Sequence, residues 1–502
     1  MVTEKRDAPK GREAQISNIR AAIGVADAVR STLGPGGFDK MLVSEGMDTL
    51  VTNDGASILR EIDVEHPGAE MMVEASKTQE ATCKDGTTSV VVLAGQLLAV
   101  SEVLLMRGVH PSDIIRAYQE AGQLVLSDLT DDSHWLTDVD IIDIAKTALR
   151  GKAAETDLDR AAALCVEAAK KANGNLDRIR VVTQTGGSLS DSSVHPGVIL
   201  NKSFASDETP KHLEGPVLLL NGGLEGFDYS QVQMQVNDVE QFHQIQQQEH
   251  RILSEAAAMV AGAAEGGCVF VRDRVHEAVS HYLAQQGIGL ITSLQASDME
   301  ALSRLTGAPI YHRIEDVAEA PPSANVVEKN IGDLRYVTVD GNGDAVTLLI
   351  RGATRQTLDE FERAFDDAVG VTCLYQNDPR AVPGGGAAYS HFGRLVRKKA
   401  QDTEGLSARE RMAIEAFADG LEVIPATIAS NAGMDALDIV MELRSSTDPK
   451  QGLYINGAVR GIENMVEVGV VEPLSLVEQV ISSALEVSIS ILRIDDIMGR
   501  RA

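Results

Sequence analysis

The sequence has few cysteines and few aromatic residues. Its 502 residues include four cysteines and one tryptophan, and aromatic residues make up 4% of the chain. The cysteines, which are Cys83, Cys165, Cys268 and Cys373, lie more than 80 residues apart and form no C-x-x-C pair. This spacing argues against a disulfide framework or a cysteine zinc site, and it predicts free thiols in a reducing compartment.

Positive charge is also scarce. Lys and Arg number 45 against 74 Asp and Glu, which gives a formal net charge of -29, and only 15 of the basic residues are lysine. Such a surface repels phosphate backbones and anionic lipids, so neither nucleic acid nor a membrane is expected as the main partner. An acidic, lysine-poor chain is consistent with a salt-rich cytoplasm, where ions screen self-repulsion.

Several common signatures are missing as well. Residues 1–7 lack the apolar segment of a secretory signal, and no stretch is expected to reach transmembrane length, so we predict a soluble, cytoplasmic protein. The absence of a Walker A pattern and of a complete G-x-G-x-x-G argues against a P-loop or Rossmann site. His276 and His281 are five residues apart rather than the four of H-E-x-x-H, so zinc is not expected there.

The most informative stretch that is present is Lys-Asp-Gly-Thr-Thr-Ser at residues 84–89, which leads directly into a mostly apolar, helix-like segment at 90–98. A helix N-terminus offers unpaired N–H groups, hydroxyls add donors and Gly lets the backbone approach closely, so the stretch suits phosphate. Asp85 would repel phosphate unless Mg²⁺ lay between them. The alternative is that Asp85 caps the helix through the N–H group of Thr87 or Thr88.

The pattern along the chain predicts about two to four domains. A helical period over 16–33 ends in the Gly-rich turn 34–37, and two short strands follow before Asn53-Asp54-Gly55, a turn of hairpin-like composition. Buried-strand patterns alternate with helices from about 200 to 350, which is typical of an α/β domain. The helical stretches on both sides predict one helical domain assembled from both ends of the chain.

Smaller signals lie within these regions. Residues 237–260 form a Gln-rich amphipathic pattern with few apolar positions, so this helix is expected to pack weakly and to project from the body. Capping-box patterns begin at Ser297, Ser407 and Ser475 and predict three helix starts. Trp135 is most simply interpreted as core or surface filling.

Three acids next to turns or on helix ends, Asp54, Asp85 and Asp367, are candidates for a shared site. Phosphoryl transfer to water needs a metal ligand and an acceptor that orients the attacking water, and three carboxylates can fill both roles. Spacing alone leaves open whether these acids meet.

The chain resembles the group II chaperonin subunits of the thermosome and the eukaryotic cytosolic chaperonin. The resemblance extends in order over essentially the whole sequence. It is carried by segments 32–42 (TLGPGGFDKML), 52–59 (TNDGASIL), 85–95 (DGTTSVVVLAG), 384–387 (GGGA), 418–425, 431–433 (NAG), 469–474 (GVVEPL) and 491–496 (ILRIDD).

The resemblance implies a multidomain α and α/β fold. A mostly helical equatorial domain would comprise residues 1–133 and 384–502, a small intermediate domain 134–199 and 351–383, and an α/β apical domain 200–350. A helical protrusion near 230–260, including Asn237 to Glu249, would form a built-in lid. It further implies stacked rings of identical or paralogous subunits, eight per ring, that enclose non-native proteins and use ATP with Mg²⁺.

Site residues are carried over by the same resemblance. Asp85 corresponds to the Mg²⁺-coordinating acid, and Asp54 and Asp367 to the acids that position the attacking water. Lys152 resembles the lysine that senses the γ-phosphate. The remaining positions would hold phosphate or nucleoside: Leu33, Gly34, Pro35, Asn53, Gly55, Gly86, Thr87, Thr88, Ser89, Gly385, Gly386 and Glu472.

The sequence departs from the family pattern at three places: Lys84 replaces a Gly, Gly36 replaces a Lys, and Tyr389 replaces a Glu. If the missing Gly had a positive φ, Lys84 would be strained there; alternatively its ammonium would pair with Asp85 or phosphate. We therefore keep two hypotheses, an ATP-driven folding machine and a divergent, weakly hydrolysing structural subunit of a mixed ring. An unrelated phosphotransferase is not favoured, because it gives the lid-like insert no role.

Overall fold

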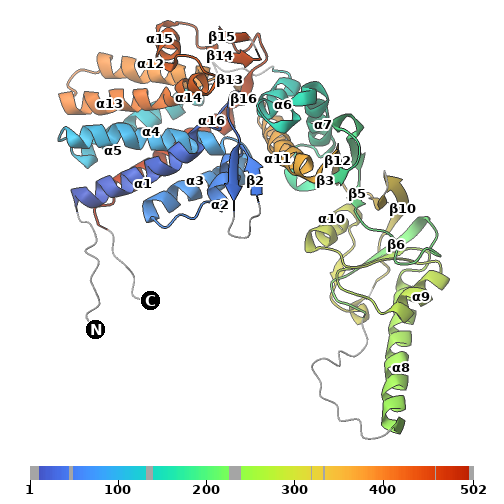
Figure 1. The fold of residues 1–502 in the computed structure, drawn as a ribbon. Helices are drawn as coiled ribbons and strands as arrows, with labels where there is room; N and C mark the ends of the chain where they lie inside the picture. Colours follow the sequence, from blue (N-terminus) through green and yellow to red (C-terminus); the bar gives the residue numbers. More distant parts are fainter. Residues whose placement is uncertain are drawn as a thin grey trace, which may run out of the picture. The chain divides into compact units, whose positions relative to one another are not determined.

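The computed structural model describes residues 11–43, 49–131, 139–224, 239–317, 319–331, 334–457 and 459–496. The chain divides into two compact units, one formed by Met1–Ala169 with Asp359–Ala502 and the other by Lys170–Leu358. In Figure 1 the blue and the orange-to-red parts of the chain make up most of the first unit. The finer division into equatorial, intermediate and apical segments stays a prediction.

The first unit is built around helix α4 (Thr87–Met106). Helices α1 (Arg12–Arg30), α3 (Pro67–Cys83), α13 (Ala408–Leu421) and α16 (Leu474–Leu492) pack around α4. The side chains of 90–94 are fully buried, because a helix that is apolar on all sides must be enclosed. The other elements of this unit are α2 (Gly55–Glu61), α5 (Pro111–Leu129), α6 (Ile141–Leu149), α7 (Leu158–Lys171), α11 (Arg355–Asn377), α12 (Ala387–Asp402), α14 (Val423–Asn431), α15 (Ala436–Ser445) and the strand pairs β1 (Lys40–Val43) with β2 (Thr49–Thr52), β13 (Ala381–Pro383) with β16 (Val471–Pro473), and β14 (Gln451–Asn456) with β15 (Val459–Asn464).

The described residues of the second unit form two sheets. The smaller sheet has the order β3-β12-β4 (Ile179–Thr185, Val346–Gly352, Ser193–Pro196). The larger sheet has the order β5-β11-β10-β6-β7-β8 (Val198–Leu200, Leu334–Asp340, Ser323–Ile331, His212–Leu220, Cys268–Val271, Gly289–Ile291), and β9 (Ile310–Tyr311) also pairs with β6. Strands β6 to β9 are parallel, and Val217 pairs with Cys268. Helices α8 (Val239–Ala263), α9 (Glu277–Gln285) and α10 (Ala296–Thr306) accompany them.

Helix starts agree with the sequence in part. The capping box at Ser407 and Glu410 is confirmed. The box predicted at Ser297 is wrong, because α10 starts two residues earlier and its box joins Gln295 to Asp298. The box predicted at Ser475 is also wrong, since α16 follows Pro473 without a side-chain cap. Helix α8 lies where the Gln-rich helix was predicted, whereas residues 225–238 and Trp135 lie outside the described residues.

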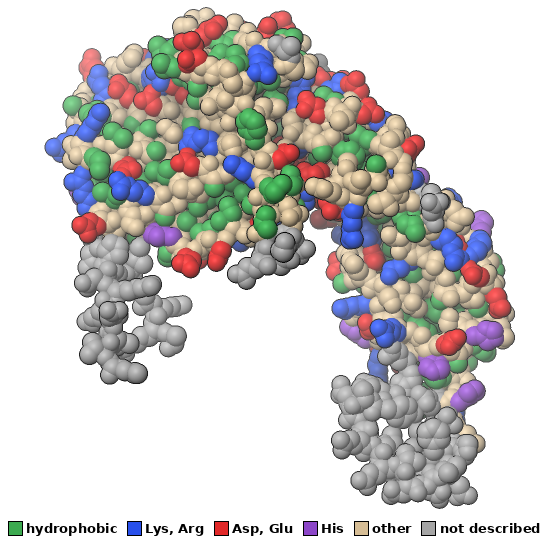
Figure 2. All heavy atoms as spheres, viewed as in Figure 1, with side chains coloured by type: hydrophobic (Ala, Val, Ile, Leu, Met, Phe, Trp, Pro, Cys, Tyr) green, Lys and Arg blue, Asp and Glu red, His purple; other side chains and the backbone are tan. Residues whose placement is uncertain are grey.

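All four cysteines are buried free thiols, as predicted. Helices α4 and α16 are long and apolar enough to cross a membrane, so the expectation that no stretch reaches this length is wrong. In each, 61% of the apolar window is buried inside the protein, which is typical of core helices. Figure 2 shows acidic side chains spread over the visible face of each unit rather than gathered in one patch.

Candidate active site

A pocket in the first unit collects residues from both ends of the chain. Its walls come from the turn after α1, the starts of α2 and α4, the segment after α6, helix α11, the triple-Gly turn and the start of α16. The residues assigned to the site from the sequence all line it: Leu33, Gly34, Pro35, Asn53, Asp54, Gly55, Asp85, Gly86, Thr87, Thr88, Ser89, Lys152, Asp367, Gly385, Gly386 and Glu472.

Helix α4 opens into this pocket with a free N-terminus. Its N-cap Gly86 has φ 80°, and among the residues that the structure describes no side chain caps the first turn of α4. Asp85 does not cap it, so that alternative is wrong; its Oδ1 instead accepts a hydrogen bond from the N–H of Gly86 at 2.9 Å. Gln79 Nε2 fixes the loop by donating to the carbonyl of Asp85 at 2.9 Å. The N–H groups from Thr87 onward therefore face the pocket ready for an anion.

Two of the candidate acids, Asp85 and Asp367, pair with Lys152, and Asp54 is near enough for its charge to act on Lys152 and Asp367. Its Nζ lies 2.7 Å from Asp367 Oδ2 and 3.5 Å from Asp85 Oδ1. Burial raises the pKa of Asp367 to about 8; Lys152 lowers it, and the charges of Asp85 and Asp54 raise it. Burial alone would lower the pKa of Lys152, but the attraction of Asp367 and Asp85 outweighs it and raises the pKa. One cation thus holds together acids that are far apart in sequence.

Asp54 has a second, structural role. Its carboxylate accepts hydrogen bonds from the N–H groups of Ala56 and Ser57 and so caps α2. The turn Asn53-Asp54-Gly55 is therefore a helix start and not the hairpin turn that its composition indicated. Asn53 Nδ2 donates to the carbonyl of Gly151 at 2.9 Å, which ties this turn to the segment that carries Lys152.

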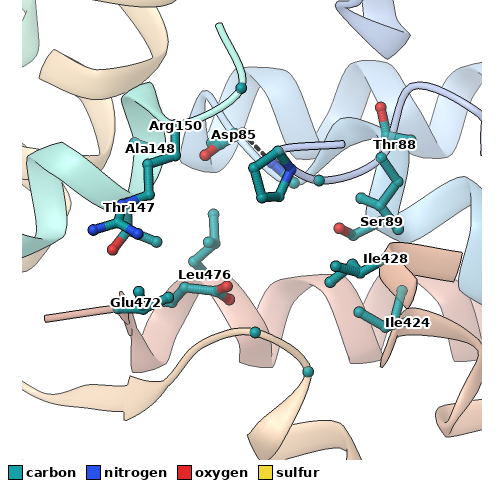
Figure 3. A pocket seen from close by; sticks show the side chains of 18 of the residues that line it. Asp85, Thr88, Ser89, Thr147, Ala148, Arg150, Ile424, Ile428, Glu472 and Leu476 are labelled. Atoms are coloured by element: carbon teal, nitrogen blue, oxygen red, sulfur yellow. Dashed lines mark hydrogen bonds between the residues drawn. The ribbon is translucent and has the colours of Figure 1, made fainter. Parts of the chain in front are cut away.

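The far end of the pocket is formed by the triple-Gly turn and β16. Gly386 has φ 77° and is the N-cap of α12, and a Cβ there would lie 2.7 Å from Pro425 Cβ. Burial, with the charge of Asp85, raises the pKa of Glu472 to about 7. Figure 3 shows Glu472 and Leu476 facing Asp85 across the pocket.

Sequence reasoning missed several lining residues. Arg150 and Thr147 form one side of the pocket, and the Arg150 guanidinium lies 5.4 Å from the ring centroid of Tyr454 (Figure 3). Arg150 could have been assigned to the pocket from the sequence, because it lies two residues before Lys152. The apolar wall had none, because buried apolar residues look alike in sequence: Ile424, Ile428, Leu453, Ile455 and Leu476.

Lys84 adopts the conformation that was expected to strain it. Its φ is 65° and ψ -16°, and its N–H donates to the carbonyl of Glu80 at the end of α3. The alternative, an ion pair between Lys84 and Asp85, is not formed, since the cation that pairs with Asp85 is Lys152. The stem of Lys84 instead packs against Gly370 of α11.

The other two departures are Gly36, which has a steric explanation, and Tyr389, which is buried in the pocket wall. Gly36 approaches the backbone of Ala432 so closely that a Cβ would lie 2.9 Å from Ala432 Cα. Tyr389 is 5% exposed and lines the pocket. Burial, with the charge of Glu472, raises the pKa of the Tyr389 phenol, so it stays neutral.

The donors suit a cation that is shared with a ligand. Within the described residues, no group of three or more His, Cys, Asp or Glu is arranged to hold a metal ion. Asp85 uses Oδ1 for the Gly86 N–H, and its carboxylate remains 28% exposed in the pocket. Hard carboxylate oxygen is a typical Mg²⁺ ligand, and Mg²⁺ commonly takes its other ligands from phosphates and water. The residues present therefore fit Mg²⁺ together with a phosphate.

The sequence model of the TCP-1/cpn60 chaperonin family matches residues 25–502. The chain belongs to this family. It is 40% identical to a thermosome subunit of Methanopyrus kandleri over 98% of this chain and 93% of that protein. The thermosome subunit beta of Archaeoglobus fulgidus is 37% identical over 98% and 93%, and thermosome subunit 1 of Haloferax volcanii is 38% identical over 97% and 89%. These similarities place the chain among group II chaperonins, which fold non-native proteins.

Proposed function

We propose that the pocket binds ATP with Mg²⁺ and hydrolyses it to drive chaperonin action. Chaperonins of this family use ATP. The observation that carries the proposal is the meeting of Asp54, Asp85 and Asp367 around Lys152 beside the uncapped N-terminus of α4.

Phosphate binding would use N–H and hydroxyl groups of residues that line the pocket. The first N–H groups of α4 and the hydroxyls of Thr87, Thr88 and Ser89 would donate to phosphate oxygens. Leu33 to Pro35 would line the opposite side. Gly385, Gly386 and Glu472 would hold the nucleoside, with the apolar wall of Ile424, Ile428 and Leu453 against the base.

Hydrolysis needs a water molecule oriented toward the terminal phosphate. Asp54 and Asp367 would accept hydrogen bonds from that water, and the ionised form of Asp367, which predominates above its raised pKa of about 8, would take its proton. Lys152, already paired with Asp367, would move toward the phosphate when the anion arrives, which frees Asp367. Mg²⁺ held by Asp85 and phosphate oxygens would neutralise the charge that develops.

At the level of the assembly, we propose stacked rings of identical or paralogous subunits, eight per ring, in the cytoplasm. ATP turnover in the first unit would close the protrusion that includes α8 over a non-native client. A weakly hydrolysing structural subunit is less well supported, because the unusual Lys84 lies against α11 and leaves Asp85 to Lys152.

The experiment is ATP hydrolysis by the purified protein and by Asp367→Asn. General-base contributions predict a loss in kcat of at least about 100-fold for Asp367→Asn, with assembly and nucleotide affinity retained. The matched control is Asp359→Asn, an exposed acid two turns earlier on α11, which should hydrolyse ATP like the parent. Equal rates for Asp367→Asn and the parent would contradict the proposal. Negative-stain images with and without ATP would report ring assembly and closure.

A further inference from the structure

Lys84 stands at a strained point of the phosphate-facing loop. It ends α3 in the left-handed region, with φ 65°, directly before Asp85. Side chains with a Cβ rarely adopt this conformation, so it persists where surrounding contacts hold it. The contacts of the Lys84 side chain therefore matter.

The first contact is with a glycine in the middle of a helix. A Cβ built on Gly370 of α11 would lie 2.5 Å from both Cβ and Cγ of Lys84, closer than atoms can approach. The stem of Lys84 thus fills the space that a side chain at residue 370 would need. Glycine inside a helix is unfavourable, and this contact gives Gly370 a packing reason.

The second contact is electrostatic. Asp366 lies one turn before Gly370 on α11. Desolvation by neighbouring atoms raises the pKa of Asp366, and the positive charge of Lys84 acts in the opposite direction. The stem of Lys84 therefore packs against α11, its charge acts on Asp366 of the same helix, and Lys84 is not among the residues that line the pocket.

These contacts lie next to the proposed reaction site on both segments that carry its acids, the loop before α4 and helix α11. Lys84 is the neighbour of Asp85, and Asp366 is the neighbour of Asp367, whose carboxylates share Lys152 at 3.5 and 2.7 Å. A shift of α11 relative to the loop would change the spacing of Asp85 and Asp367 directly. Errors of about 1 Å in such geometry cost about 100-fold in rate.

We propose that Lys84 is a positioning residue that fastens the phosphate-facing loop to α11 through Gly370 and Asp366, and thereby sets the spacing of Asp85 and Asp367. This inference rests on the proposed ATPase function. It assigns Lys84 and Gly370 as a matched pair, because the stem of Lys84 occupies the space that a side chain at residue 370 would need.

The test is a double-mutant cycle on ATP hydrolysis by the full chain, with Lys84→Gly, Gly370→Ala and the double variant. Gly370→Ala should lower kcat while the KM for ATP stays close to that of the parent, because the methyl displaces α11 and not the nucleotide-binding walls. In the Lys84→Gly background the same methyl has room, so its effect on kcat should be smaller by at least about three-fold. If Gly370→Ala alone does not fold, recovery of a folded, active protein in the double variant demonstrates the same coupling between residues 84 and 370.

Two further variants separate stem from charge. Lys84→Arg keeps both and should retain the parent kcat, whereas Lys84→Met keeps the stem and should lie between the parent and Lys84→Gly. Lys77→Met, an exposed lysine two turns earlier on α3, should behave as the parent. Equal effects of Gly370→Ala in both backgrounds, while Asp367→Asn still abolishes hydrolysis, would overturn this inference alone. Absence of hydrolysis by the parent protein would overturn the proposed function as well.

Discussion

Lys152 is the residue whose removal tests the geometry of the site most directly. Its Nζ lies 2.7 Å from Asp367 and 3.5 Å from Asp85, and the side chains of the three residues are 22%, 19% and 28% exposed. At an effective dielectric constant of about 20, the attraction at the shorter distance is about 6 kcal/mol, and desolvation offsets much of it. Removing one partner of a buried pair costs about 3 to 5 kcal/mol, so for this partly exposed group we expect Lys152→Met to lose about 2 to 4 kcal/mol.

The measurement is thermal unfolding at pH 8 without nucleotide and with a chelator. For a unit of this size the expected loss corresponds to a midpoint lower by about 3 to 6 °C. Lys146→Met is the control, because Lys146 pairs at 2.5 Å with Asp159, which is 86% exposed, and a surface pair contributes at most about 1 kcal/mol.

Magnesium supplies a second readout for the same variant. Without the ammonium, the carboxylate of Asp85 loses its cationic partner and should attract the divalent cation, so Mg²⁺ should raise the midpoint of Lys152→Met more than that of the parent. If Lys152→Met unfolds at the parent temperature and responds to Mg²⁺ as the parent does, Asp85 and Asp367 are not held together by this lysine, and the reasoning about the site is wrong.

Three other predictions concern single positions. Asp54→Asn should keep the cap of α2 and lose ATP turnover, whereas Asp54→Ala should also lose about 1 kcal/mol of stability. Thermal unfolding and the ATPase rate, measured on both variants, would separate the loss of the cap from the loss of turnover. The pKa of Asp367 is raised to about 8, so the folded state holds a proton that the unfolded chain releases above about pH 4; the contribution of this group to stability is present below that pH and is lost by about pH 8. The stability of nucleotide-free Asp367→Asn should therefore decrease less steeply between pH 5 and 8.5 than the stability of the parent. Parallel curves of stability against pH would refute the raised pKa of Asp367. Gly386→Ala must place a Cβ 2.7 Å from Pro425 at φ 77°, and it should cost about 1 to 3 kcal/mol of stability and weaken nucleotide binding, as titration with a fluorescent ATP analogue would show.

How far the sequence predicted the site depends on the kind of residue. The Gly turns and the acids next to them were recognisable, because turns and helix starts restrict which residues they accept. Periodicity also indicated a helical unit around the apolar segment after Ser89. That Asp54, Asp85 and Asp367 meet was left open by spacing, and the resemblance to chaperonins, not local physics, was the reason to expect it.

What the sequence could not provide are contacts that only the tertiary structure creates. Asp85 looked like a helix cap, but its carboxylate turns to the N–H of Gly86, so the acid stays beside the pocket. Ser475 matched a capping box, yet Pro473 ends β16 and α16 begins immediately, before the serine can act as a cap. Ile424 and Ile428 line the pocket without any mark that distinguishes them from core residues. In each case a neighbour distant in sequence decides the outcome.

The substitution at Lys84 shows why a departure from a family pattern is best judged together with its surroundings. Considered alone, a lysine at φ 65° next to Asp85, the acid proposed to hold Mg²⁺, indicates damage to the site. Considered alone, Gly370 inside α11 indicates a weakened helix. The structure places the stem of one in the space left by the other, with Asp366 near the charge, so the two unfavourable local choices become one favourable contact. A local rule that is broken with a visible compensation is typical of a retained function rather than of decay. The contact between Lys84 and Gly370 therefore favours a retained activity, and we expect that restoring the family glycine at residue 84 alone, by Lys84→Gly, lowers ATP turnover instead of improving it.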